Sequence, residues 1–338
     1  MPPAVRCLPE RSRLVAAPSA LARAGLGTAG LALLAACSAS PTANVIAADG
    51  VLCDITRRLA AADLRVQCLL SPEDDPHQFQ LTPSQSRDLR QARLVLINGY
   101  GLTPALERLS TAIPVAEKAV PDSPRLSHDA TSHPGHQHGA QDPHVWHDPN
   151  QAVALVTAVS QQLQQLKPAA ATAIGQRAAA MTQTLTALDR WNHLQFASLP
   201  ARPGQRTLAT GHRAFTSLSR AYGLRELAVV DDESASDSLR PQALAAAVRR
   251  LQQDRVPALF SETWPPSRAL SRISELSGVP LAPQALRADG LTPAAGPTSS
   301  AGDLMATLTT NTCLIVEQLG GKCDRGEQER LLRRWQAI

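Results

Sequence analysis

The chain has 338 residues, of which 43% are hydrophobic and only 3% aromatic, and its formal net charge is +4 at pH 7. This length exceeds what one compact core usually holds, so we expect two domains with cores of alanine, leucine and valine. Residues 1–36 contain four arginines and one glutamate, which leaves 29 basic and 28 acidic residues in the rest. A nearly neutral chain offers no basic patch for nucleic acid. After residue 40 no stretch is long and apolar enough to cross a membrane.

The first 36 residues have the order of a secretory signal. Four arginines precede the apolar stretch Leu26–Ala36, which is too short to span a bilayer. The stretch ends in Leu-Ala-Ala before Cys37, which resembles a bacterial lipobox. We therefore predict a lipoprotein-type signal peptide over residues 1–36 and lipidation of Cys37. The mature chain would lie in the periplasm or cell envelope and contact the membrane through its lipid anchor only. A plain signal peptide cleaved nearby is the alternative, and it too would export the chain.

Four cysteines remain once Cys7 is removed with the signal and Cys37 is assigned to lipid. They are Cys53, Cys68, Cys313 and Cys323. An even number in an oxidising compartment indicates disulfides, most simply Cys53 with Cys68 and Cys313 with Cys323. A zinc site built from these cysteines is the alternative, and the absence of a close CxxC pair counts against it.

Short leucine-rich and β-branched runs alternate with helical stretches, which predicts parallel βαβ units. In the first half we expect strands at residues 44–48, 64–70, 93–98 and 113–116, and helices at 51–61 and 84–91. In the second half we expect strands at 206–210, 225–230, 257–261 and 279–282, and helices at 214–222 and 241–254. The predicted fold is α/β, with two lobes, residues 37–167 and 198–338, each a parallel sheet flanked by helices.

The segment between the predicted lobes has almost no strand signal. It is rich in alanine, and Ile174, Met181, Leu185 and Leu188 keep the spacing of one helix face. Pro168 suits the first turn of a helix. We therefore predict one long rigid helix over residues 168–197 that joins the two lobes.

Six of the nine histidines lie within 20 residues, and this window ends in the string DPHVWHDP. They are His128, His133, His136, His138, His144 and His147. Neutral imidazole is a common protein ligand for transition metals, so the cluster indicates metal binding. The first four lie in a polar loop, residues 121–142, whose composition cannot bury a core or fix a tetrahedral geometry. These four could gather zinc weakly and pass it inward; a solvated loop without function is the alternative.

Four side chains lie just beyond predicted strands or at helix entrances, where open α/β folds bind ligands. His77 follows the second strand, His144 precedes a helix that Asp148 is expected to cap, His212 follows the strand at 206–210, and Asp289 lies beyond the last strand. Three imidazoles and one carboxylate form a tetrahedral shell that suits Zn²⁺.

Several strings, taken together, resemble a known family. They are PHQFQLTPSQ, DPHVWHDP followed by a helix, the long central helix, GHRAF opening a helix, and LFSE on a late strand. In this order they resemble the metal-binding substrate-binding proteins of bacterial ABC transporters, and within them the zinc-specific ZnuA and AztC type (cluster A-I). The resemblance implies two lobes with the metal in the cleft between them. It assigns His77 and His144 to the first lobe, and His212 and Asp289 to the second.

The chain departs from the family pattern at two positions. His147 stands where many relatives have leucine, and an LDPLG-like string appears as Leu281–Ala285 without its aspartate. The string RADGLTPAAGP resembles the segment that supplies the carboxylate ligand in other members, so Asp289 takes that role. Glu262 is the competitor, because manganese-binding relatives use the glutamate on this strand. His212 at the third position favours zinc. Glu262 and His147 are then expected either to orient the ligands without binding the metal or to replace one of them.

The predicted function is extracytoplasmic capture of zinc and its delivery to an ABC transporter permease by a monomer that is not an enzyme. A periplasmic zinc chaperone is a further candidate partner. Three alternatives remain: a manganese-binding homologue, a periplasmic zinc chaperone or buffer without a permease, and a secreted zinc hydrolase. A hydrolase needs an open coordination position and a general base, and the HExxH motif is absent from the chain. Glu262 beside three histidines could still mimic such a site if Asp289 were not a ligand.

Overall fold

The computed structural model describes residues 45–72, 74–126, 141–230, 240–293 and 302–338. All of them belong to one compact unit, Thr42–Ile338. The predicted signal peptide of residues 1–36, the lipidation site Cys37 and most of the predicted loop lie outside the described residues. The same holds for the four loop histidines, His128, His133, His136 and His138.

The first lobe is built on a parallel sheet of four strands in the order β2-β1-β3-β4. The strands are β1 (Val45–Ala47), β2 (Val66–Cys68), β3 (Leu94–Ile97) and β4 (Ala112–Pro114). Its helices are α1 (Gly50–Ala60), α2 (Pro83–Gln91), α3 (Val115–Ala119) and α4 (Pro149–Leu166). All four strands lie within the residues predicted from the sequence or overlap them, and every pairing is parallel.

The second lobe contains a smaller parallel sheet in the order β6-β5-β7. Its strands are β5 (Thr207–Thr210), β6 (Arg225–Ala228) and β7 (Leu259–Phe260), and its helices are α6 (Thr216–Tyr222), α7 (Pro241–Gln253) and α8 (Arg268–Ser277). The strand predicted at 279–282 is reduced to one parallel bridge between Leu281 and Leu259. The helix α8, which follows a proline-rich turn, was not among the predicted elements.

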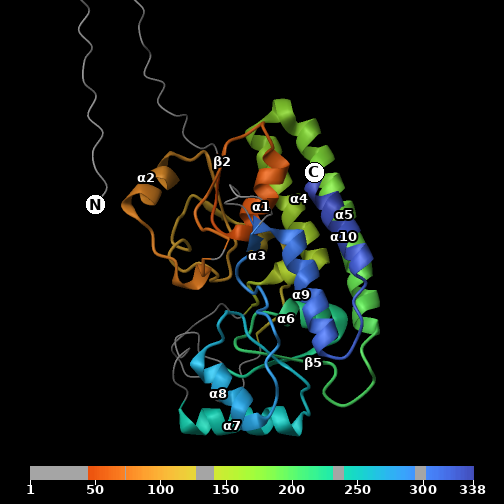
Figure 1. The fold of residues 1–338 in the computed structure, drawn as a ribbon. Coiled ribbons are helices and arrows are strands. Elements are labelled where there is room, and N and C mark those ends of the chain that lie inside the picture. The colour runs from red at the N-terminus through yellow and green to blue at the C-terminus, as the bar shows by residue number, and fades with distance from the viewer. Residues whose placement is uncertain (1–44, 73, 127–140, 231–239, 294–301) are drawn as a thin grey trace, which may run out of the picture. The chain divides into compact units, whose positions relative to one another are not determined.

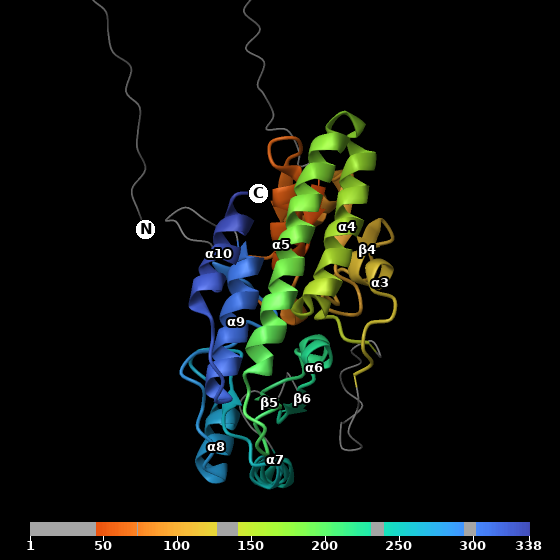
Figure 2. The same cartoon turned by 90° about the vertical axis from the view of Figure 1, so that its right-hand side faces the viewer.

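The long helix α5 (Ala171–Ala197) joins the two lobes, as predicted, and Figure 2 shows it running beside α4. Its first turn differs from the prediction, because Pro168 begins a separate 3-10 turn, η3 (Pro168–Ala170). Ile174 and Leu185 pack into the first-lobe core, the buried cluster that contains Val45, whereas Phe196 packs into the second-lobe core around Phe215. Among the described residues no helix, α5 included, is apolar enough over a sufficient length to cross a bilayer.

A second helix also crosses between the lobes, which the sequence did not indicate. This helix, α9 (Leu304–Gln318), follows a short antiparallel pair, β8 (Thr292–Pro293) and β9 (Gly302–Asp303). Leu304 and Leu308 belong to the first-lobe core, and Ile315 and Leu319 to the second-lobe core. The last helix, α10 (Arg325–Gln336), returns to the first-lobe core through Leu331 and Trp335. The C-terminal helices therefore bind both lobes together (Figure 1).

The buried carboxylate of Asp54 in α1 fastens these C-terminal helices to the first lobe. Its Oδ2 accepts hydrogen bonds from the backbone N–H of Leu304 at 3.0 Å and from Nε1 of Trp335 at 3.1 Å. Its Oδ1 accepts from Nε of Arg58 at 2.8 Å. Burial raises the pKa of Asp54, although the Arg58 charge opposes this shift. One side chain thus satisfies donors from three helices.

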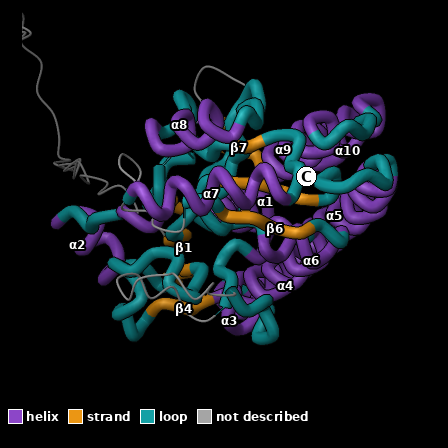
Figure 3. The backbone as a smooth tube through the Cα atoms, turned by 90° about the horizontal axis from the view of Figure 1, so that it is seen from below, coloured by secondary structure: helices purple, strands orange, loops and turns teal. Residues whose placement is uncertain are grey.

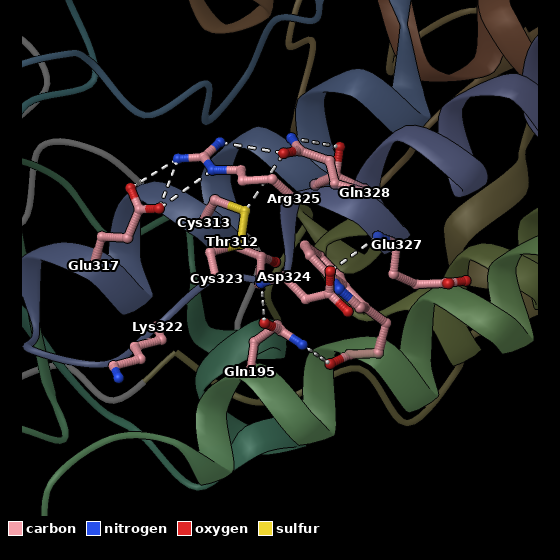
Figure 4. Close-up of a disulfide and its surroundings, with 12 residues drawn as sticks. Gln195, Thr312, Cys313, Glu317, Lys322, Cys323, Asp324, Arg325, Glu327 and Gln328 are labelled. Atoms are coloured by element: carbon pink, nitrogen blue, oxygen red, sulfur yellow. Dashed lines mark hydrogen bonds and ion pairs between the residues drawn. A yellow bond between two sulfur atoms is a disulfide. The ribbon is translucent and has the colours of Figure 1, made fainter.

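Both disulfides that the sequence predicts are present. Cys53 of α1 is bonded to Cys68 of β2, with their Cα atoms 5.6 Å apart, and Cys313 of α9 to Cys323, with their Cα atoms 5.2 Å apart. Figure 4 shows the second bond at the turn between α9 and α10. There the backbone N–H of Asp324 donates to Oε1 of Gln195 at 2.8 Å. The disulfide therefore ties this turn to α9, and the hydrogen bond from Asp324 ties it to α5.

We predict that Asp54→Ala lowers the free energy of unfolding by about 3 kcal/mol, because it leaves the Leu304 and Trp335 donors buried without an acceptor. Urea unfolding followed by circular dichroism measures this change. Arg272→Ala is the control, since it removes only an exposed ion pair with Glu275 and should change the free energy by less than about 0.5 kcal/mol. Equal losses in the two variants would contradict the role given to Asp54.

Candidate metal site

The structure brings the four predicted ligands together. Oδ1 of Asp289 lies 3.1 Å from Nε2 of His77 and 2.8 Å from Nε2 of His144. Oδ2 of the same carboxylate lies 3.3 Å from Nε2 of His212. One donor atom from each of the four residues lies within 4.8 Å of the others, and no other such group of ligating side chains occurs in the described ranges. Donor atoms around tetrahedral zinc, with bonds of about 2.0 Å, are about 3.3 Å apart, so the spacing fits such an ion.

Each histidine is placed by a short local structure. His77 lies in the 3-10 turn η1 (Pro76–Gln78) after β2, and its backbone N–H donates to Oδ1 of Asp75 at 2.9 Å. His144 opens the 3-10 turn η2 (Val145–His147), which runs directly into α4. His212 follows β5, where Oγ1 of Thr210 donates to its carbonyl at 2.9 Å. The three imidazoles therefore converge from three separate loops.

Asp289 lies where the chain passes from the second lobe to the first. Before it, the side chain of Asn311 in α9 pairs with the backbone of Arg287, accepting from its N–H at 3.0 Å and donating to its carbonyl at 2.8 Å. After it, the backbone N–H of Leu291 donates to the carbonyl of Pro72 at 2.7 Å. Leu291 is fully buried in the first-lobe core. The carboxylate is therefore held from both sides.

The charges in the site are strongly coupled. Burial alone would lower the pKa of His144, but hydrogen bonds to Asp142 and Asp289 outweigh it and raise the pKa to about 10. Burial also opposes protonation of His212, and the Asp289 charge raises its pKa to about 9. Burial would raise the pKa of Asp289, yet the His212 charge and the histidine hydrogen bonds hold it well below its usual range. Without a metal, the carboxylate is thus charged and paired with protonated imidazoles at neutral pH.

Asp142 contacts His144 on the side of Nδ1, a role that was not predicted from the sequence. Its Oδ1 accepts from the backbone N–H of His144 at 2.9 Å and lies 3.1 Å from Nδ1 of the same residue. Its Oδ2 accepts from the N–H and the hydroxyl of Ser217 in α6, at 2.9 and 2.7 Å. A proton on Nδ1 leaves Nε2 to face the metal. The signal in the sequence was the aspartate two residues before His144.

Glu262 and His147, the alternative or supporting residues, lie beside the four-residue group but outside it. Oε1 of Glu262 accepts from the backbone N–H of Gly211 at 2.8 Å and is 4.0 Å from Nδ1 of His212. Burial raises the pKa of Glu262 to about 7. His147 is buried and contacts the carbonyl of Ala288 at 2.9 Å. Asp148 caps α4, as expected, by accepting from the N–H of Asn150.

Residues 45–318 match the family described as zinc-uptake complex component A, periplasmic. The chain belongs to this zinc-uptake component A family. It is 30% identical over 242 residues to the zinc-binding protein TroA of Treponema pallidum (strain Nichols), covering 68% of this chain and 73% of TroA. The solved structure of TroA superposes with a TM-score of 0.70, covering 82% of this chain and 99% of that one. The two-lobed α/β fold is thereby confirmed.

Other proteins to which this chain is similar carry the names of other metals. The manganese ABC transporter substrate-binding lipoprotein PsaA of Streptococcus pneumoniae is 23% identical over 249 residues, which cover 72% of this chain and 79% of PsaA. The iron-binding protein YfeA of Yersinia pestis is 24% identical over 238 residues, which cover 70% and 74%. This protein is therefore a periplasmic metal-binding component of an ABC transporter. The prediction that it is not an enzyme is confirmed by its family, and the hydrolase alternative is set aside.

We predict that zinc binding at pH 7 releases about two protons, one from His144 and one from His212, because both imidazoles must lose a proton to bind metal. Since the raised pKa of His144 is about 10 and that of His212 about 9, apparent affinity should fall as the pH drops below about 10, and more steeply below about 9. Calorimetric titration in buffers of different ionisation enthalpy counts the protons. Binding at pH 7 without proton release would contradict this account of the charges.

We predict that Asp142→Asn weakens metal binding by about 10- to 100-fold, because the amide no longer fixes the His144 tautomer that presents Nε2 to the metal. Chelator competition with the purified protein measures the affinity. Asp122→Asn is the matched control, since Asp122 is exposed and should leave the affinity unchanged. Equal affinity in the two variants would show that Asp142 has no such role.

Proposed function

We propose that this protein captures Zn²⁺ outside the cytoplasm and delivers it to the permease of its ABC transporter. His77, His144, His212 and Asp289 are the proposed ligands. The donor set is the observation that carries the choice of metal: three imidazole nitrogens and one carboxylate within 4.8 Å of one another. Zinc binds readily to such nitrogen-rich tetrahedral sets, whereas manganese favours sets richer in oxygen.

Manganese is the second candidate, and Glu262 is the residue on which it depends. A second carboxylate in the shell would make the site harder and would favour manganese. Oε1 of Glu262 is directed to the backbone N–H of Gly211, and it stays 4.0 Å from the His212 ring. In this arrangement Glu262 stabilises the His212 charge and leaves the metal to the other four side chains. The contact supports zinc over manganese.

Entry and release of the ion are proposed to take place on the side of His212 and Asp289. Their side chains are 18% and 17% exposed, whereas those of His77 and His144 are only 7% and 2% exposed. Protonation or strain at the two more accessible ligands would therefore release the ion first. The permease is the partner that can apply such strain during delivery.

We propose the remaining parts of this function from the sequence. Residues 1–36 export the chain, Cys37 carries a lipid that anchors it to the membrane, and the protein works as a monomer. The loop histidines, His128, His133, His136 and His138, collect zinc weakly and pass it inward. A periplasmic zinc chaperone is a further partner that could load the protein.

The central test is His144→Ala, which removes the most buried of the proposed ligands. We expect the zinc affinity in chelator competition to fall by at least about 100-fold, because a closed shell loses one of its ligands. The same titration with manganese on the unaltered protein should give much weaker binding than with zinc.

His193→Ala is the control, because His193 lies on α5 with a side chain 59% exposed and outside the group of four. Its zinc affinity should match that of the unaltered protein. Undiminished affinity in His144→Ala would falsify the proposed site, and tighter binding of manganese than of zinc would overturn the choice of metal.

A further inference from the structure

A histidine from the first lobe contacts the backbone beside the proposed carboxylate ligand. His147 ends the turn η2, and its Nε2 lies 2.9 Å from the carbonyl oxygen of Ala288, the residue before Asp289. The His147 residue is only 1% exposed. The proposed metal ligand His144 begins the same turn. The turn therefore contributes to the site in two ways. It carries the proposed ligand His144, and through His147 it contacts the backbone next to the proposed ligand Asp289.

The direction of this hydrogen bond follows from its chemistry. A carbonyl oxygen only accepts, so Nε2 of His147 must carry the proton and donate it. Burial lowers the pKa of His147 to about 4, so the ring is neutral at physiological pH and carries one proton. Its Nδ1 has no hydrogen-bond partner within the part of the chain that the structure describes. The one N–H group of this ring is thus used in the hydrogen bond to the carbonyl of Ala288.

We propose that His147 is a positioning residue that holds the Asp289 carboxylate in the metal site and thereby slows release of the ion. This inference rests on the proposed function, since it takes Asp289 as a ligand. Asn311 fixes Arg287 and Pro72 fixes Leu291. Between these two points His147 donates to the backbone carbonyl of the residue directly before Asp289, and it ties the second-lobe side of this segment to the first lobe.

A packing role for His147 is the competing explanation. Its ring lies against Phe215 of the second lobe, with centroids 4.7 Å apart, and against Trp146, with centroids 5.4 Å apart. An apolar side chain could fill this space equally well, but it could not donate to Ala288. A test must therefore separate the donor from the volume of the side chain.

Two substitutions of equal length make this separation. His147→Gln places an amide N–H near the position of Nε2, whereas His147→Met fills similar space without a donor. We expect His147→Met to speed zinc dissociation in a chelator chase by about 10- to 100-fold, as loss of a group that orients a ligand commonly does. His147→Gln should restore most of the slow dissociation.

Cobalt(II) in place of zinc supplies a spectroscopic readout that packing alone should not change. We expect the ligand-field bands of His147→Met to differ from those of the unaltered protein, because a displaced carboxylate alters the coordination, and those of His147→Gln to match. Phe215→Leu is the packing control: it shortens the ring's neighbour, leaves the donor in place and should keep the original dissociation rate.

The outcomes separate the two claims. Equal dissociation rates for His147→Met and His147→Gln would overturn the positioning role, as would an acceleration by Phe215→Leu as large as that by His147→Met. Failure of the unaltered protein to bind zinc or cobalt would instead overturn the proposed function. Slow release by His147→Gln and fast release by His147→Met would support the inference even if both variants are less stable.

Discussion

The two carboxylate oxygens of Asp289 lie within hydrogen-bonding or ion-pair distance of three imidazoles, each from a different loop, and the rest of the site is arranged around them. Bringing four polar side chains together away from bulk solvent would cost folding free energy unless their charges were balanced. The carboxylate provides that balance by holding protons on its neighbours when no metal is present. A divalent cation can take the place of those protons, so the empty and loaded states of the site are both electrically satisfied.

The support around this carboxylate explains the arrangement of the rest of the fold. Asn311 of α9 holds the backbone of Arg287, two residues before the carboxylate, and Leu291 anchors the following backbone in the first-lobe core. Asp142 ties His144 to α6 through Ser217, which links the two lobes at a second point. The site is therefore part of the interface between lobes, and its geometry depends on helices that contribute no ligand. Seen from below in Figure 3, α5 and α10 lie on the right-hand side of the strands.

The structure brings the four proposed ligands together, and each could be selected from the sequence because it lies in a short local motif. His144 stands in DPHVWHDP, and the β-strands before His77 and His212 have clear β-branched or leucine-rich patterns. The helix α9 was not predicted as a connection, because its two ends enter different cores and local periodicity says nothing about which core a residue joins. The role of Asn311 could not be predicted either, because its partner Arg287 is 24 residues away in the sequence. Only the tertiary fold brings the two residues together.

The pair of helices that spans both lobes has a consequence for recognition. Because α5 and α9 pack on each other and each is buried in both cores, bending one requires displacing the other. A connection reinforced in this way resists rotation of one lobe against the other and keeps the outer faces of the lobes nearly fixed. A membrane partner that must tell cargo-bearing from empty protein then has little global rearrangement to read. It must instead sense a local difference at the site, where protons on the imidazoles beside Asp289 take the place of the ion.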